Sequence, residues 1–208
     1  ADSQIGGHYT EGNALQYTWH VLQDIPGLIE LMGGKEAAEK LLDYLFNTTQ
    51  ESAVQLSDVT GLIGQYAHGN EPSHHVAYIY SYLDRPEETQ RLIRQITTDF
   101  YQNKPDGLIG NDDCGQMSAW YMFSVMGFYP MNPVSGELVI GAPQIPKAVI
   151  NVGNGKRFTM EAKNLSEENM YVEKIELNGQ PYDKKFITHD DIINGSTLVF
   201  YMTNSPKK

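Results

Sequence analysis

The chain has 208 residues, a formal net charge of −11, and 40% hydrophobic and 20% charged residues. Binding to nucleic-acid phosphates requires a basic surface, so this charge excludes that partner. No apolar run approaches the ~20 residues that span a bilayer. The single cysteine, Cys114, excludes an intrachain disulfide. The length suits one ordinary globular domain or pieces of two.

The first part of the chain, up to about Tyr129, has the periodicity of helices separated by Gly-rich loops. The clearest helix is expected from Lys35 to Phe46, where apolar residues recur on one face. A second begins at Pro86, with two glutamates in its first turn and a buried stripe reaching Phe100. Residues 116–126 are apolar nearly all round, which predicts a helix buried on several sides.

The second part, from Glu137 onward, has short Val/Ile/Tyr-rich runs separated by turn dipeptides. Asn-Gly pairs stand at 154–155, 178–179 and 194–195, and such pairs favour tight hairpins. We therefore predict an α + β chain in sequence order, with helices over residues 1–130 and an antiparallel sheet over 131–208. The segment Tyr129–Pro133 suits a rigid connector between them.

Three clusters combine a carboxylate with Gly and Asn next to an expected helix start. They are residues 11–13 (EGN), 69–71 (GNE) and 110–113 (GNDD). Each cluster alone is equally well explained by capping and turn formation. The loops before alternate helices converge at one end of a helical barrel, so we expect the three to meet there.

Polar and aromatic side chains flank the three clusters, a mixture typical of carbohydrate sites. The candidates for contact with a sugar are Asn13, Gln16, Trp19, His74 and Gln116. Glycoside hydrolysis requires one protonated carboxyl and one carboxylate that activates water, which separate loops could supply. Nucleophilic catalysis fits less well, because no serine lies in an elbow motif and Cys114 has no convincing base.

A metal site is a further possibility around the second cluster. His68, Glu71, His74 and His75 are close in sequence, but the zinc-protease spacing HExxH is absent. Asn70 and Glu71 offer hard oxygen donors instead, which suit Ca²⁺ better than Zn²⁺.

Four long strings resemble consecutive motifs of glycoside hydrolase family 92. They are YTEGNALQYTW (9–19), AHGNEPSHHVAYIY (67–80), DGLIGNDDCGQMSAWYMFSVMGFYPMNP (106–133) and ELNGQPYDKKFITHDDI (176–192). The resemblance covers essentially the whole chain. It implies an inverting exo-α-mannosidase with an (α/α)6 catalytic domain, an N-terminal β-sandwich, and a Ca²⁺ that grips the mannose hydroxyls.

Matching the motifs residue by residue assigns roles to the clusters. The resemblance makes Glu11 the general acid and Asp113 the general base, supported by Asn111 and Asp112. It associates Asn70 and Glu71 with the calcium ion.

Two departures from the usual family motif bear on linkage and aglycone preference. In EGNALQYTWHVLQD, Leu15 stands where relatives have Trp and Gln23 where they have His.

The resemblance also implies which parts of the enzyme this chain represents. Residues 1–130 correspond to the last helices of the toroid and 131–208 to strands packed on it, with the sandwich and first helices missing. We expect hydrolysis of terminal, α-1,2-linked mannose from N-glycans or mannans, in the bacterial periplasm or outside the cell. As a fragment, the chain could be inactive alone and form a homo-oligomer.

Two alternatives remain at this point. One is a non-catalytic carbohydrate-binding or structural module, in which the carboxylates are caps. The other is an (α/α)6 glycosidase with a different sugar specificity.

Overall fold

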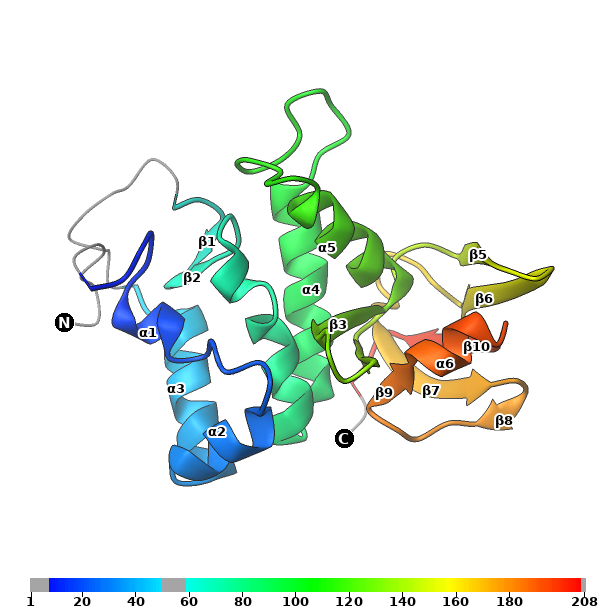
Figure 1. Ribbon diagram of the computed structural model, residues 1–208, viewed down its shortest axis with the longest axis horizontal. Coiled ribbons are helices and arrows are strands. Elements are labelled where there is room, and N and C mark those ends of the chain that lie inside the picture. Colours follow the sequence, from blue (N-terminus) through cyan, green and yellow to red (C-terminus); the bar gives the residue numbers. More distant parts are fainter. Residues whose placement is uncertain (1–7, 50–58, 207–208) are drawn as a thin grey trace.

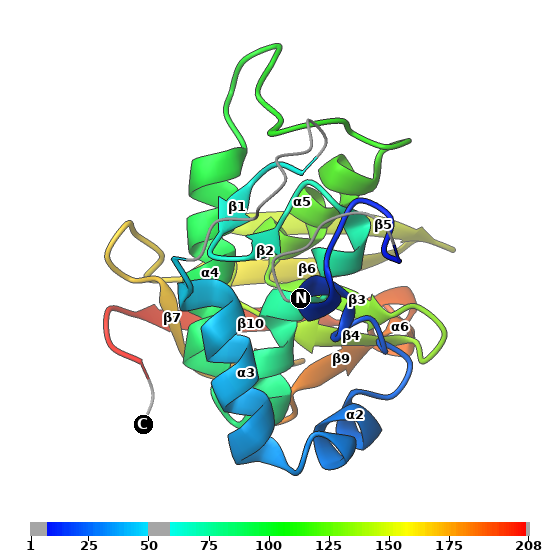
Figure 2. The ribbon, with the colours of Figure 1, turned by 90° about the vertical axis from the view of Figure 1, so that its left-hand side faces the viewer.

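The computed structural model describes residues 8–49 and 59–206 of the chain. Helices occupy one side and strands the other (Figure 1). Figure 2, in which the helical side faces the viewer, shows the strands behind the helices. Within the described ranges, no helix is long and apolar enough to cross a membrane.

The helical half is built around four main elements, two of which were predicted from the sequence. They are α2 (Ile25–Leu31), α3 (Lys35–Asn47), α4 (Pro86–Phe100) and the 3-10 helix η2 (Val76–Leu83). Shorter pieces are α1 (Ala14–Tyr17), the hairpin β1–β2 (Leu62–Ile63 and Tyr66–Ala67) and η1 (Glu71–Ser73). The helices expected from Lys35 and from Pro86 are therefore confirmed.

Helix α5 (Gln116–Met126) is confirmed as a helix, but its predicted burial on several sides is wrong. Trp120 is fully buried, whereas Met122 is 56% exposed. Ser118 and Ala119 are exposed as well. In the described residues one face of α5 therefore has no covering layer, although its sequence is apolar there.

The segment after α5 is a strand, not the expected connector. Strand β3 (Phe128–Asn132) pairs antiparallel with β4 (Glu137–Ile140), which pairs in turn with β9 (Phe186–Thr188). Pro130 is tolerated because β3 lies at the edge of this sheet, where a missing N–H leaves no ladder bond unmade. The ladder also shifts register between Tyr129 and Asn132.

The larger sheet has five strands in the order β5-β6-β10-β7-β8. Their bounds are β5 Lys147–Gly153, β6 Lys156–Lys163, β7 Tyr171–Leu177, β8 Gln180–Pro181 and β10 Thr197–Thr203. Tight turns at Asn154-Gly155 and Asn178-Gly179 join β5 to β6 and β7 to β8, as predicted.

The prediction of a wholly antiparallel sheet is wrong at one pair of strands. Strand β10 runs parallel to β6 and antiparallel to β7. The Asn194-Gly195 pair makes no hairpin, because it follows a short helix, α6 (His189–Ile193). Thr188 and Asp191 form a capping box that starts α6, and the chain then enters β10 between β6 and β7. That crossover sets the parallel pairing.

Two hydrophobic cores meet at the small sheet. Tyr129 and Val139 belong to the core of the helical half, whereas Phe128 and Leu138 belong to the core beneath the large sheet. Successive side chains of a strand point to opposite faces, so β3 and β4 contribute to both cores. The small sheet therefore fixes the helices against the strands.

Close packing also fixes the β1–β2 hairpin against the end of α3. Gly64 turns the hairpin with φ +60, and a Cβ there would lie 2.4 Å from the Leu45 carbonyl oxygen. The Gln65 N–H donates to that same oxygen at 2.7 Å. The hairpin thereby fixes the position of the segment that follows it, residues 68–71, relative to α3.

We predict that Gly64→Ala destabilises the fold more than Gly155→Ala does. Gly155 also has a positive φ, +72, but nothing lies within 4 Å of its missing Cβ. Both changes force alanine into a left-handed backbone, at about 1 to 2 kcal/mol. Gly64→Ala adds overpacking against fixed backbone atoms, at about 1 to 3 kcal/mol. Urea unfolding of the two variants measures the difference, and equal losses would contradict this account of the hairpin.

Candidate active site

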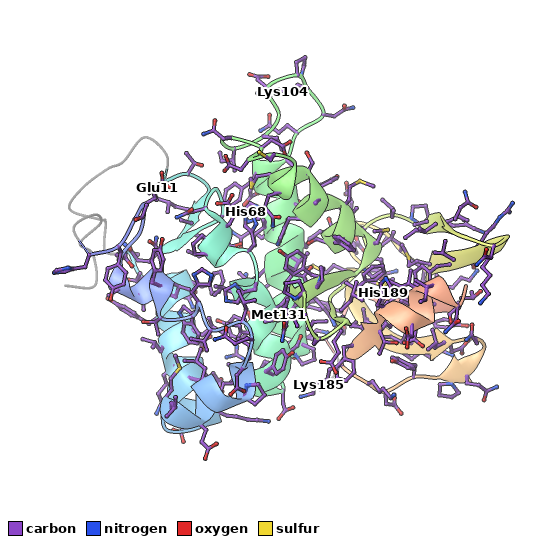
Figure 3. All side chains as sticks on the ribbon, in the orientation of Figure 1. Glu11, His68, Lys104, Met131, Lys185 and His189 are labelled. Atoms are coloured by element: carbon purple, nitrogen blue, oxygen red, sulfur yellow. The ribbon has the colours of Figure 1, made fainter. Side chains whose placement is uncertain are left out.

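The three predicted clusters meet at one pocket of about 230 Å³. Its lining comes from four separate stretches of chain: Glu11, Thr60, Gly69, Asn70, Gly110, Asn111 and Asp113. All of these residues lie in loops that precede or join the helices and strands of the helical half. In Figure 3, Glu11 lies at the margin of the helical half, and His68 lies nearer to the middle of the molecule.

The loop that carries Glu11 is fixed by the start of α1. The side chain of Asn13 caps the helix by accepting from the Gln16 N–H at 3.0 Å, and Gln16 Oε1 accepts from the Asn13 N–H at 2.9 Å. Both amides also bind Gln65, through its side chain and its carbonyl oxygen. Reciprocal capping of this kind satisfies two backbone donors at once. It anchors α1 to the β1–β2 hairpin.

Asn70 connects the second cluster to the first. Its side-chain Nδ2 donates to the Glu11 carbonyl oxygen at 2.8 Å. The neighbouring Glu71 is exposed and does not line the pocket. Of the two residues predicted for the metal, the structure brings only Asn70 to the site.

The third cluster divides its carboxylates between two roles. Asp113 lines the pocket from a backbone with φ +50. Asp112 Oδ1 instead accepts from the Ser118 N–H at 3.0 Å and from its hydroxyl at 2.8 Å. Asp112 thus fixes the first turn of α5, and its predicted support of the base is indirect. Asn111 lines the pocket, as expected of a group beside the base.

Thr60 is a pocket residue that the sequence did not reveal. Its hydroxyl oxygen is buried without a hydrogen-bond partner among the described residues. A Cβ at Gly69 would lie 2.2 Å from that oxygen, and one at Gly110 would lie 2.8 Å from it. Thr60 therefore separates the second and third clusters. One threonine beside a glycine gives no sequence signal of such a position.

Comparisons with known proteins bear on what this arrangement is. The sequence matches the family described as "Glycosyl hydrolase family 92 catalytic domain" over residues 1–204. The chain belongs to glycosyl hydrolase family 92.

Structures of this family have the same fold over the whole segment. An α-mannosidase of Bacteroides thetaiotaomicron in complex with mannoimidazole is 46% identical, with a TM-score of 0.93 over 99% of this chain and 28% of its own. An inverting mannosidase of the same organism is 35% identical, with a TM-score of 0.86 over 99% and 29%. An "uncharacterized secreted glycosidase" of Arthroderma benhamiae is 29% identical over 90% of this chain and 23% of its own. The chain thus spans less than a third of the length of these relatives.

Four of the five side chains that were predicted to contact a sugar are buried in this family 92 protein. Asn13 and Trp19 are fully buried, His74 is 2% exposed and Gln16 is 5% exposed. Asn13, Gln16 and His74 use their polar atoms for internal hydrogen bonds. These four side chains are buried in this structure, and their contact with a sugar stays a prediction. Gln116 is half-buried and lies outside the pocket lining, with its amide nitrogen 3.0 Å from His74 Nδ1.

The burial of His74 determines its protonation. Nε2 must donate, because its partner is the His68 carbonyl oxygen at 2.9 Å. Nδ1 then accepts from the Gln116 amide, which is the pattern of a neutral imidazole. Burial lowers the pKa of His74 in spite of the nearby negative charges of Glu71 and Asp113. A neutral ring with both nitrogens bonded is a rigid support between the second cluster and α5.

His68 lies beside His74 and is held in the same way. Its Nδ1 is 2.8 Å from the Tyr66 hydroxyl and its Nε2 is 2.7 Å from that of Tyr101. Tyr101 in turn donates to the Met117 carbonyl oxygen at 3.1 Å. Burial lowers the pKa of His68 well below its usual value, and the neighbouring His74 ring lowers it further, because two protonated imidazoles side by side would repel each other. The interior beneath the pocket is therefore uncharged at neutral pH.

The residues around the pocket fit a hard cation only in part. In the part of the chain that the structure describes, no three His, Cys, Asp or Glu side chains gather closely enough to hold a metal ion. The lining nevertheless carries amide and carboxylate oxygens, on Asn70, Asn111, Glu11 and Asp113. These are donors that Ca²⁺ accepts, together with carbonyl, water or sugar oxygens. The oxygen donors in the lining are of the type that calcium accepts, but within the described residues they do not complete a coordination shell.

His75 provides a test of the uncharged interior. Its Nε2 donates to the Trp19 carbonyl oxygen at 2.6 Å, and burial lowers its pKa to about 4. An unfolded histidine titrates near 6.5, so between these values only the unfolded state binds the proton. Stability then falls as pH decreases, by about 1.4 kcal/mol per unit inside this window. We expect His75 to contribute a loss of about 2 kcal/mol between pH 7 and pH 5.

The matched variant is His75→Gln, which keeps an N–H donor but cannot titrate. Urea unfolding at pH 7 and pH 5 should show a smaller loss for the variant than for the wild type. An identical pH dependence in both proteins would mean that His75 is not kept neutral by the fold.

Proposed function

We propose that the protein removes terminal α-linked mannose, with a preference for the α-1,2 linkage, from N-glycans or mannans by an inverting, calcium-dependent mechanism. The observation that supports this most is that Glu11 and Asp113, from loops about a hundred positions apart in the sequence, line one small pocket. Membership of family 92 and the mannosidases among its relatives give the substrate class.

The two carboxyl groups have complementary roles in this proposal. Glu11, in its protonated form, donates a proton to the glycosidic oxygen as the bond to the sugar breaks. Asp113 takes a proton from a water molecule, whose oxygen attacks the anomeric carbon from the opposite face. The product is β-mannose, and the two carboxyls exchange protons with solvent to restore the starting state. Such pairs stand roughly 6.5 to 9.5 Å apart, which is the separation we expect here.

Pocket size favours action on a chain end. The pocket of about 230 Å³ is smaller than sites for drug-sized ligands, which are roughly 300–1,000 Å³. A single sugar ring suits it better than an oligosaccharide laid across it. The polar lining supplies amide and carboxylate groups for hydroxyls that would be buried on binding.

Calcium would be held by oxygen atoms of the pocket lining. In the second cluster, the candidate protein ligand is Asn70 Oδ1. When bound, it would supply positive charge to hold the mannose hydroxyl oxygens. Glu71 does not line the pocket, so it would be a calcium ligand only if other parts of the full-length protein extend the site toward it. The number of protein carboxylates at the pocket is small, so sugar oxygens would form part of the coordination shell.

The substrate is tested with the full-length protein that carries this segment. We expect hydrolysis of α-1,2-linked mannobiose in calcium and at least a tenfold loss in chelator, with α-1,3- and α-1,6-linked isomers cleaved more slowly. Proton NMR of the first product should show β-mannose before α-mannose. The appearance of α-mannose first would overturn the inverting mechanism and the roles of both carboxylates.

The carboxylates are tested by amide replacement. Glu11→Gln and Asp113→Asn should each lower kcat on mannobiose by about 10² to 10⁴, because each removes one proton transfer. Asp112→Asn is the control, since the Asp112 carboxylate bonds to Ser118 at the start of α5. We expect it to affect stability more than kcat. A Glu11→Gln enzyme with normal kcat would remove Glu11 from catalysis.

Two other functions give different results in the same assays. A non-catalytic carbohydrate-binding module would bind mannosides without releasing sugar, in calcium or chelator. A glycosidase of different specificity would leave mannobiose intact and cleave a glucoside.

The location that we propose is outside the cytoplasm, in the periplasm, at the cell surface or secreted. The description of the fungal relative as a secreted glycosidase supports this proposal. Fractionation of the producing cells, with the full-length protein followed by antibody, tests it.

A further inference from the structure

Glu11 has a backbone conformation that its residue type does not favour. Its φ is +52, in the left-handed region. Among the described residues, Glu11 and Cys114 are the two left-handed positions occupied by neither Gly, Asp nor Asn. A glutamate adopts this conformation only where surrounding contacts hold it. The contacts of the Glu11 backbone therefore decide where its carboxyl lies.

We propose that the side-chain amide of Asn70 is a positioning residue for the general acid: it holds the Glu11 peptide in the left-handed conformation that directs the carboxyl into the pocket. The inference rests on the proposed function, and it adds a role for Asn70 that is separate from metal binding. The contact that carries it is the 2.8 Å hydrogen bond from Asn70 Nδ2 to the Glu11 carbonyl oxygen.

The chemistry of the two groups fixes the direction of this bond. A carbonyl oxygen can only accept, so the amide nitrogen of Asn70 must face Glu11, and its Oδ1 must face elsewhere. Asn70 stands at the N-terminus of η1, where asparagine commonly caps a helix, yet it makes no side-chain cap there. Its amide nitrogen reaches instead across 59 positions of the sequence to the acid loop.

Among the described residues, the other contacts of the acid loop hold the neighbours of Glu11 and not its carbonyl group. The Tyr17 hydroxyl donates to the Thr10 carbonyl oxygen at 2.6 Å, one residue before Glu11. The Asn13 capping box fixes the chain two residues after it. Gly12 is buried against the Tyr17 ring, which would lie 2.6 Å from a Cβ at that position. The Glu11 carbonyl thus lies between two fixed points, and Asn70 is its partner.

The segment that carries Asn70 is itself rigid. The Asn70 N–H donates to the Ala67 carbonyl oxygen, and its own carbonyl accepts from the Ser73 N–H at 3.0 Å. The Gly69 N–H donates to the Thr60 carbonyl oxygen at 3.0 Å. A donor on a fixed backbone can impose a conformation on a loop that lacks one of its own. Asn70 therefore transmits the rigidity of the β1–β2 hairpin to the acid.

A positioning role and a metal role make opposite demands on Asn70. A metal ligand needs Oδ1, whereas the bond to Glu11 needs the N–H donor. Asn70→Asp keeps the oxygen that could bind a metal but replaces the N–H donor with a second oxygen. That carboxylate oxygen would then face the Glu11 carbonyl oxygen and could not bond to it. Asn70→Ala removes both the oxygen and the donor. Asn154→Asp is the matched control for the added charge, because Asn154 lies in the exposed β5–β6 turn.

The experiment compares two substrates in the full-length protein. Mannobiose needs a proton on its leaving oxygen, and 2,4-dinitrophenyl α-mannoside does not. We expect Asn70→Asp to lower kcat on mannobiose by about 100-fold, as a misplaced catalytic group does, with less than about a threefold change on the aryl mannoside. Glu11→Gln should give the same selectivity. Calcium affinity of Asn70→Asp, measured by calorimetry, should stay within about threefold of wild type.

Two readouts would overturn the proposal. One is an equal loss on both substrates that excess calcium restores, which would make Asn70 a metal ligand alone. The other is unchanged activity of Asn70→Asp on mannobiose.

Hydrogen exchange separates this inference from the proposed function. In Asn70→Ala the backbone amides of residues 10–12 should exchange at least about tenfold faster than in wild type and in Asn154→Asp, whether or not the protein cleaves mannosides. If the wild type cleaves neither substrate, the proposed function fails and the exchange rates still decide the positioning role. Unchanged exchange would overturn it.

Discussion

The position of the pocket walls depends on the hydrogen bonds of one residue, His74, whose imidazole is neutral. One nitrogen donates to the His68 carbonyl oxygen and the other accepts from Gln116, while the Trp120 indole donates to the His74 carbonyl oxygen at 2.9 Å. Only an uncharged ring has one donor and one acceptor, so burial and bonding reinforce each other. Because His74 follows the second cluster and Gln116 follows the third, these bonds hold the two walls of the pocket in one position.

The pocket illustrates how local strain accompanies function. Both proposed catalytic carboxylates, Glu11 and Asp113, have left-handed backbones, with φ +52 and +50. Such conformations persist only where neighbouring structure over-determines them. The buried supports here are uncharged: capping amides for α1, a histidine (His68) held between two tyrosine hydroxyls, and a threonine between two glycines. The charged side chains that line the pocket are the carboxylates of Glu11 and Asp113, where the proposed proton transfers require them.

The two halves of the chain form one unit because of β3 and β4. Their side chains enter the two cores alternately, so a shift of these strands would disturb the hydrophobic core of the helical half. Tyr129 shows the connection most directly, since its ring stacks on Tyr78 at 5.2 Å and its hydroxyl lies 3.4 Å from the Gln116 amide. The exposed face of α5 belongs to the same unit and, within the described residues, has no layer over it.

Sequence by itself determined the elements whose signals are local. Helical periodicity gave α3 and α4, the Asn-Gly turns gave two hairpins, and the repeated combination of carboxylate, Gly and Asn gave the three clusters of the pocket. Long motifs gave the family. The relation between distant parts does not follow from such local signals, because periodicity reports which face is apolar and not what covers it. Tertiary structure alone made β10 parallel to β6 and left one face of α5 exposed. It also buried Trp19 and His74, which the sequence had suggested as sugar-contacting residues because they are aromatic or polar and lie near a carboxylate. It also decided that Asn70 bonds to Glu11, since a hydrogen bond across 59 residues follows from where folding brings two loops and leaves no trace in either loop's own sequence.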